Sequence, residues 1–160
     1  MTAIGFYHLT RFSLDQALPK LLLKVQAAGL RAVIQAGSAE RMAHLDAMLW
    51  TFAPDSWLPH GTTAQPMPDQ QPILIAVAAE NLNQASVLIL ADGAPPDSLE
   101  GYERCLVLFD GHDPEKVAAA RGFWRRWTTE GYGLSYYQQS EAGGWELKHQ
   151  TVAQAPPATD

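Results

Sequence analysis

The sequence predicts an α/β fold, a three-layer α/β/α sandwich around a mostly parallel sheet with Rossmann-like topology. Short apolar runs, typical of strands buried on both faces, alternate with segments of helical periodicity. Strand, helix, strand and helix already follow one another within residues 4–51, as in the opening of a doubly wound sheet. A chain of 160 residues suits one such domain, which we expect over residues 1–150, with a disordered tail over 151–160.

The first half of the chain contains two strand and helix pairs. Ser13, with Gln16 three residues on, predicts a capped helix start, and Ser38 predicts a second. Pro19 is compatible with the first helix only within its first turn or at a kink. The predicted elements are a strand at 4–9, a helix at 14–28, a strand at 31–36 and a helix at 39–51.

The second half begins with a polar loop and ends with a long helix and a hairpin. Asp113-Pro114-Glu115 predicts the start of that helix, because proline suits its first position and acids suit its positive end. The predicted elements are a loop at 61–72, strands at 73–78, 86–90 and 102–109, a helix from 113, and a strand hairpin that ends at 150.

Composition excludes several classes of function. The net charge of −6, with 17 acids and 11 bases, argues against binding nucleic acid over a broad surface. The longest apolar runs fall far short of the ~20 residues of a membrane span, and the N-terminus does not resemble a signal peptide. With Cys105 as the single cysteine, an internal disulfide is excluded, and we expect a buried thiol in a cytoplasmic protein.

Motifs for nucleotides and metals are missing from the sequence. The turn after the first strand, residues 8–13, contains no glycine, whereas a dinucleotide-binding turn requires several. The five histidines are scattered without the spacing of a zinc motif. We therefore expect no cofactor, no bound metal and no catalytic residues, although a nucleotide-dependent α/β enzyme remains an alternative.

The final helix concentrates positive charge in an acidic chain. Lys116, Arg121, Arg125 and Arg126 lie within about three turns of the helix and are interleaved with Trp124. Cations on a helix are usually a solvated face. A tryptophan beside arginines favours a binding surface instead, because guanidinium groups stack on indole and bind carboxylates bidentately. Direct binding of single-stranded DNA by stacking and phosphate contacts is the other alternative.

A second aromatic cluster follows the helix at 39–51. Tryptophans and prolines in an irregular segment are compatible with either a partner-binding surface or a loop folded over the core. The cluster consists of Trp50, Phe52, Trp57, Leu58 and Pro59.

Four ordered segments resemble one family, the chi subunit of bacterial DNA polymerase III. They are FYHL at 6–9, LDAMLWTFAPDSWLPHG at 45–61, ERCLVLFDGHDPEKVAAAR at 103–121, and the stretch from Trp124 to Lys148 with its paired glutamines and GGWE. The resemblance implies an accessory subunit of the clamp-loader assembly of the polymerase holoenzyme, with no catalysis of its own. It also implies two partners: the acidic C-terminal tail of the single-stranded DNA-binding protein, and the psi subunit or another clamp-loader component. Association with single-stranded DNA would then be indirect.

The resemblance also gives roles to residues. Arg121 is expected to bind the terminal carboxylate of the tail, Trp124 to wall an apolar slot, and Arg125 and Lys116 to attract acidic side chains. The family's helix often carries another lysine one turn before the arginine, where this chain has Val117. Trp50 and Trp57 of the second cluster match the family's aromatic positions at the psi contact.

Overall fold

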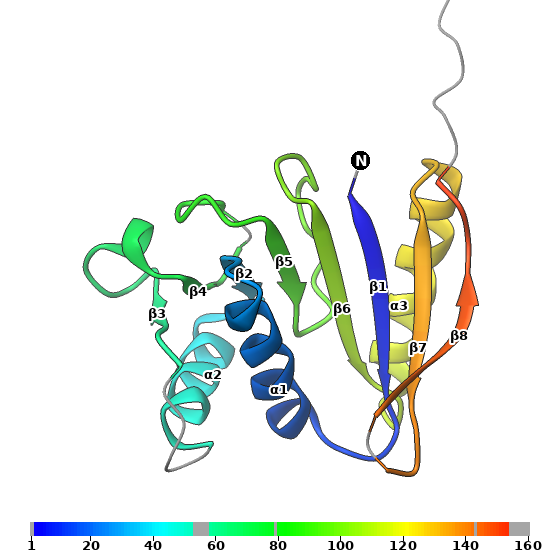
Figure 1. Ribbon diagram of the computed structural model, residues 1–160, viewed down its shortest axis with the longest axis horizontal. Helices are drawn as coiled ribbons and strands as arrows, with labels where there is room; N and C mark the ends of the chain where they lie inside the picture. The colour runs from blue at the N-terminus through cyan, green and yellow to red at the C-terminus, as the bar shows by residue number, and fades with distance from the viewer. Residues whose placement is uncertain (1, 53–57, 79, 143, 154–160) are drawn as a thin grey trace, which may run out of the picture.

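A computed structural model describes residues 2–52, 58–78, 80–142 and 144–153, and its fold is the predicted α/β sandwich (Figure 1). One sheet of eight strands forms the middle layer, with the strand order β3-β4-β2-β5-β6-β1-β7-β8. The described α-helices are α1 (Leu14–Ala27), α2 (Ala39–Thr51) and α3 (Pro114–Thr129), and a short 3-10 helix, η1 (Pro68–Gln70), lies between β3 and β4. The strands are β1 (Ala3–Leu9), β2 (Ala32–Gln35), β3 (Gly61–Thr62), β4 (Ile73–Ala76), β5 (Val87–Leu90), β6 (Arg104–Asp110), β7 (Leu134–Gln139) and β8 (Trp145–Gln150).

Neighbouring strands are parallel except at one edge, where β7 and β8 form an antiparallel hairpin. Figure 1 shows α1 and α2 in front of the sheet and α3 behind it, across β1 and β7. Alternate residues of each strand therefore enter two separate cores. One core contains Leu18 and Leu45 of the front helices, and the other contains Phe123 and Trp127 of α3.

The helix starts follow the predicted capping chemistry. Gln16 Oε1 accepts a hydrogen bond of 3.0 Å from the Ser13 N–H, and Ser38 Oγ accepts one of 3.1 Å from the Arg41 N–H. Asp113 accepts from the Glu115 N–H at 3.0 Å and thereby begins α3. These caps fix where each helix starts relative to the sheet.

The structure excludes one of the two settings expected for Pro19, and it corrects the prediction of a loop at 61–72. Pro19 lies beyond the first turn, inside an α1 that continues to Ala27. The apolar side of α1 is buried on the sheet, with Leu18 and Leu22 fully buried, and this packing offsets the backbone hydrogen bond that proline cannot make. The region 61–72 is also more than a loop, because Gly61–Thr62 forms the short edge strand β3 beside β4.

Of the predicted tail at 151–160, the structure describes residues 151–153, and residues 154–160 lie outside the described part of the chain. The first residue of this tail, Thr151, is hydrogen-bonded to Leu134 through both its backbone N–H (2.8 Å) and its hydroxyl (3.0 Å). None of the described helices is long and apolar enough to cross a membrane.

A candidate docking pocket on the α3 face of the sheet

A pocket of about 300 Å³ lies between α3 and the strands that it covers. Its walls are mostly aromatic and apolar, with one arginine and two histidines. The lining residues are Phe6, His8, Phe109, Val117, Ala120, Arg121, Trp124, Tyr136 and His149. A concave site with apolar walls and few polar groups is the usual form of a ligand pocket.

Strand register brings the floor of the pocket together. Phe6 and His8 are two residues apart on β1, so they point to the same face of the sheet. His8 pairs in register with Phe109 on β6, and Phe6 pairs with Tyr136 on β7. Tyr136 is in turn opposite His149 on β8. Four strands that are distant in sequence thus place aromatic rings side by side.

Trp124 forms the helix side of the pocket. Its ring meets Phe6 edge to face, with 5.2 Å between ring centroids, and lies 5.7 Å from His149. Trp127, one turn on, is only 1% exposed and packs in the core beneath. Trp124 is half-buried, so part of its indole surface remains available to a ligand.

Arg121 supplies positive charge at the pocket. It is exposed, and within the described part of the chain no carboxylate pairs with it or with Arg125. Arg126 differs, because it forms an ion pair of 3.2 Å with Glu130. Arg125 does not line the pocket, but it follows Arg121 by four residues and so lies on the same side of α3.

The polar groups of the floor, on His8 and Tyr136, are partly buried and contact each other. His8 Nδ1 and the Tyr136 hydroxyl share a hydrogen bond, and the His8 ring stacks on Phe109 at 4.8 Å. Burial lowers the pKa of His8 below its ordinary 6.5, and His112 and Arg121 lower it further, although Asp110 opposes the shift. Burial raises the pKa of Tyr136, while Arg121 and Lys148 partly oppose that shift.

Two turns of the chain, after β1 and after β6, support this floor by close packing. Gln139 Oε1 accepts three backbone hydrogen bonds, from Thr10 (3.0 Å), Arg11 (2.9 Å) and Phe12 (3.0 Å), and so fixes the turn after β1. Gly111 lies against the His8 ring, where a Cβ would clash with Nε2 and come within 2.9 Å of the Leu9 carbonyl oxygen. Only glycine leaves room for the ring there.

Comparison with known proteins identifies the family. The family model described as "DNA polymerase III chi subunit, HolC" matches residues 1–135. The chain belongs to this family. A protein of Rickettsia prowazekii (strain Madrid E), named "Probable DNA polymerase III subunit chi", is 30% identical over 90 residues. That match covers 56% of this chain and 54% of the relative, so the chain aligns with about half of the relative's length. The family is that of an accessory subunit of the polymerase.

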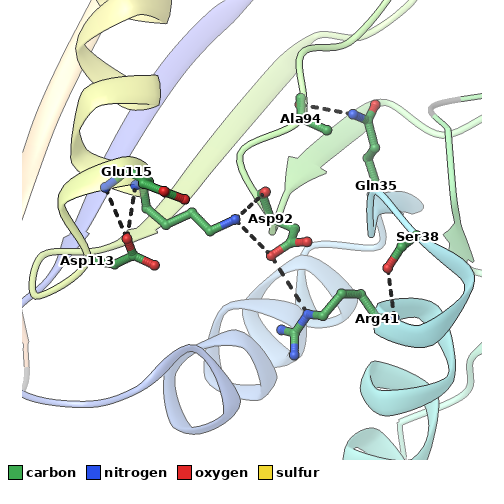
Figure 2. Close-up of polar contacts among 8 residues, drawn as sticks. Gln35, Ser38, Arg41, Asp92, Ala94, Asp113 and Glu115 are labelled. Carbon is green, nitrogen blue, oxygen red and sulfur yellow. Dashed lines mark hydrogen bonds and ion pairs between the residues drawn. The ribbon is translucent and has the colours of Figure 1, made fainter.

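The structure of this chi-family chain brings together only part of the predicted tail-binding set. Arg121 and Trp124 line the pocket, and Arg125 lies one turn further along α3. Lys116 lies elsewhere, because its Nζ donates to the Asp92 backbone oxygen (2.8 Å) and to its carboxylate (3.2 Å). Figure 2 shows Asp92 between the first turn of α3 and Arg41 of α2. The Nε atom of Arg41 lies 3.8 Å from the same Asp92 carboxylate. Lys116 and Arg41 therefore connect the two helical layers through Asp92, just beyond the end of the central strand β5.

The predicted partner surface near residues 50–59 is also only partly exposed. The Trp50 ring is 54% exposed at the end of α2, at 4.6 Å from His60. Leu58 is 3% exposed and packs in the core with α1 and α2, so it is unavailable to a partner. Phe52 is half-buried against the same core, and Pro59 is partly exposed. Trp57 lies outside the described residues.

Sequence reasoning missed the floor of the pocket. Phe6 and Phe109 lie in predicted strands, and His8 and His149 are two of the scattered histidines. Val117, on the helix side of the pocket, was noted only as the position where the family's helix often carries a lysine. The alternation of β1 places Phe6 and His8 on one face, which is a usable signal. The strand order that adds Tyr136 and His149 is visible only in the structure.

Proposed function

We propose that this chi-family chain docks the acidic C-terminal tail of the single-stranded DNA-binding protein in the pocket on the α3 face. In doing so it links the clamp-loader part of DNA polymerase III to protein-coated single strands, without catalysing a reaction itself. The observation that carries the proposal is Arg121, an exposed guanidinium without a carboxylate partner in the described chain, at an aromatic pocket.

The geometry suits a chain terminus that combines an aromatic ring with a free carboxylate. A volume of about 300 Å³ is at the lower end for ligand pockets and suits one aromatic side chain rather than a folded segment. The rings of Phe6, Trp124 and Tyr136 offer edge and face contacts to such a side chain. Arg121 can then bind the terminal carboxylate bidentately.

Acidic residues before the terminus would meet Arg125. This arginine is exposed and follows Arg121 on the same side of α3. Exposed ion pairs contribute about 0.2–1 kcal/mol each and are screened by salt. The docking should accordingly have micromolar-range affinity and weaken as the salt concentration rises.

The surface around Trp50 is proposed as the contact for a second partner, the psi subunit or another clamp-loader component. Trp50 lies in the last turn of α2, and α2 covers the face of the sheet opposite to α3. Because the sheet separates the two surfaces, both partners can bind the chain at once. Phe52, Pro59 and Trp57 are proposed to belong to this surface; Leu58, which is buried, is left out.

A peptide titration tests the tail-docking proposal. A fluorescently labelled peptide that ends in Asp-Asp-Ile-Pro-Phe should bind the full chain with micromolar-range affinity. The same peptide with a C-terminal amide should bind about tenfold more weakly or worse, because Arg121 loses its carboxylate. Equal affinity for the two peptides would contradict the proposal. A single-stranded oligonucleotide that binds more tightly than the peptide would favour direct DNA binding instead.

A further inference from the structure

His8 and Tyr136 lie in the floor of the pocket, and the docking proposal does not use their polar atoms. They come from adjacent parallel strands, β1 and β7, and His8 Nδ1 is hydrogen-bonded to the Tyr136 hydroxyl. Stacking on Phe109 and close packing against Gly111 hold the His8 ring with its Nδ1 edge toward the tyrosine. The pair therefore has a fixed geometry, and only the positions of its protons are free to change.

The protonation state of His8 decides what the Tyr136 hydroxyl can do. When the neutral ring carries its proton on Nε2, Nδ1 is an acceptor. The Tyr136 hydroxyl then donates its only hydrogen bond to Nδ1 of His8. When the ring is protonated, Nδ1 carries a hydrogen and donates it to the Tyr136 oxygen. The hydroxyl hydrogen is then released and can point to a ligand in the pocket. For this tautomer, one added proton on His8 converts the Tyr136 hydroxyl from a donor occupied by Nδ1 to a donor that is available to a ligand.

We propose that His8 and Tyr136 form a proton-dependent donor in the docking pocket, which binds an acidic peptide terminus more tightly when His8 is protonated. The inference rests on the proposed function, because the proposed occupant is anionic. The released hydroxyl and the imidazolium both favour an anion in the pocket. The inference adds two specificity-determining residues to the cation at Arg121. Both side chains line the floor of the pocket.

The charges around His8 set the direction of the effect. Arg121 on α3 and His112 after β6 disfavour a positive ring, Asp110 at the end of β6 favours it, and His149 on β8 lines the same pocket. Burial is the largest cause that lowers the His8 pKa, and with these charges it keeps the ring neutral in the free protein at neutral pH. A bound carboxylate neutralises part of the Arg121 charge and accepts a hydrogen bond from the released hydroxyl. Binding must therefore raise the His8 pKa, and by linkage affinity rises as the pH falls through the His8 pKa of the complex.

The test measures peptide affinity between pH 8 and pH 5.5 at constant ionic strength, with the full chain and the peptide ending in Asp-Asp-Ile-Pro-Phe. We expect about a tenfold gain in the wild type at pH 5.5, as for one hydrogen bond to a charged group. In His8→Asn the amide takes the place of Nδ1 but does not titrate, so the gain should disappear. Tyr136→Phe keeps the ring and removes the hydroxyl, and it should also bind without a pH-dependent gain.

Two controls separate this pair from other histidines. His149→Gln changes the other histidine of the pocket, and His44→Gln changes an exposed histidine on α2 that is paired with Asp15. Both should keep the tenfold gain. A thermal melt at each pH confirms that every variant is folded. As a readout that a purely structural role would not move, the NMR titration of the His8 ring should show a higher pKa with peptide than without it.

The outcomes distinguish this inference from the docking proposal. Binding at pH 8 tests docking alone, because His8 is neutral there in both accounts. If the peptide fails to bind at either pH, both proposals are overturned. If it binds at pH 8 but the wild-type profile is flat, only the His8–Tyr136 inference fails. The inference also fails if His8→Asn and Tyr136→Phe keep the gain, or if His149→Gln abolishes it.

Discussion

Replacing Arg121 with alanine removes the cation of the docking pocket without removing a contact that holds the fold together. The side chain is exposed and has no ion-pair partner in the described chain, so the free energy of unfolding should change by no more than about 0.5 kcal/mol. Any loss of binding can then be assigned to the site itself. This separation makes Arg121→Ala the most informative single substitution.

The size of the loss follows from the contact that disappears. A hydrogen bond to a charged group contributes about 1.5–3 kcal/mol, and an exposed ion pair contributes less than about 1 kcal/mol. Arg121 is exposed while its proposed partner would sit in a partly enclosed pocket, so we place the loss at about 1.5–2 kcal/mol. This corresponds to roughly 10- to 30-fold weaker binding of the tail peptide.

Two arginines of the same helix provide matched controls. Arg125 lies about 40° from Arg121 around the helix axis, outside the pocket, and Arg125→Ala should weaken binding by about fivefold at most. Arg126 lies about 140° away and is paired with Glu130, so Arg126→Ala should leave binding unchanged. Fluorescence anisotropy with the labelled peptide measures all three. Equal losses in the three variants would refute the site, because they would reflect only the net charge of the chain.

Three further outcomes follow from the packing around the pocket. Gly111→Ala should weaken peptide binding and lower the melting temperature, because its Cβ clashes with the His8 ring; a binding-competent, equally stable variant would contradict the close approach. Gln139→Ala leaves three backbone N–H groups without their acceptor and should cost about 2 kcal/mol in urea unfolding, whereas Gln138→Ala, its neighbour, should cost little. Burial raises the pKa of the Cys105 thiol, so it should react with a thiol reagent only at the rate of unfolding, and rapid labelling of the native chain would show that it is accessible.

The order of elements was predictable because local signals agree with the fold. Capping residues such as Ser13, Ser38 and Asp113 mark real helix starts, and short apolar runs mark real parallel strands. The position of Pro19 beyond the first turn was harder to predict, because the rule against interior proline is local, whereas the burial of α1 on the sheet is a tertiary effect. Edge strand β3 was missed for a similar reason, since two residues carry too little pattern to be recognised.

The site was only partly predictable from the sequence. Arg121 and Trp124 are on one helix, three residues apart, so helical spacing alone places them together. The same spacing puts Lys116 about 140° from Arg121, and its bond to Asp92 agrees with that separation. Tyr136 and His8 meet through strand order and register, which depend on long-range pairing. No pattern along the chain gives that information.

The tryptophan indole N–H signals of the ¹⁵N-labelled full chain test the central claim most directly. The chain has five tryptophans, which makes five indole signals, each assignable by a single substitution. On titration with the peptide ending in Asp-Asp-Ile-Pro-Phe, we predict that the Trp124 signal shifts to saturation while the Trp50 signal stays in place. A peptide that shifts Trp50 and leaves Trp124 unchanged, or shifts neither, would contradict docking in the α3 pocket.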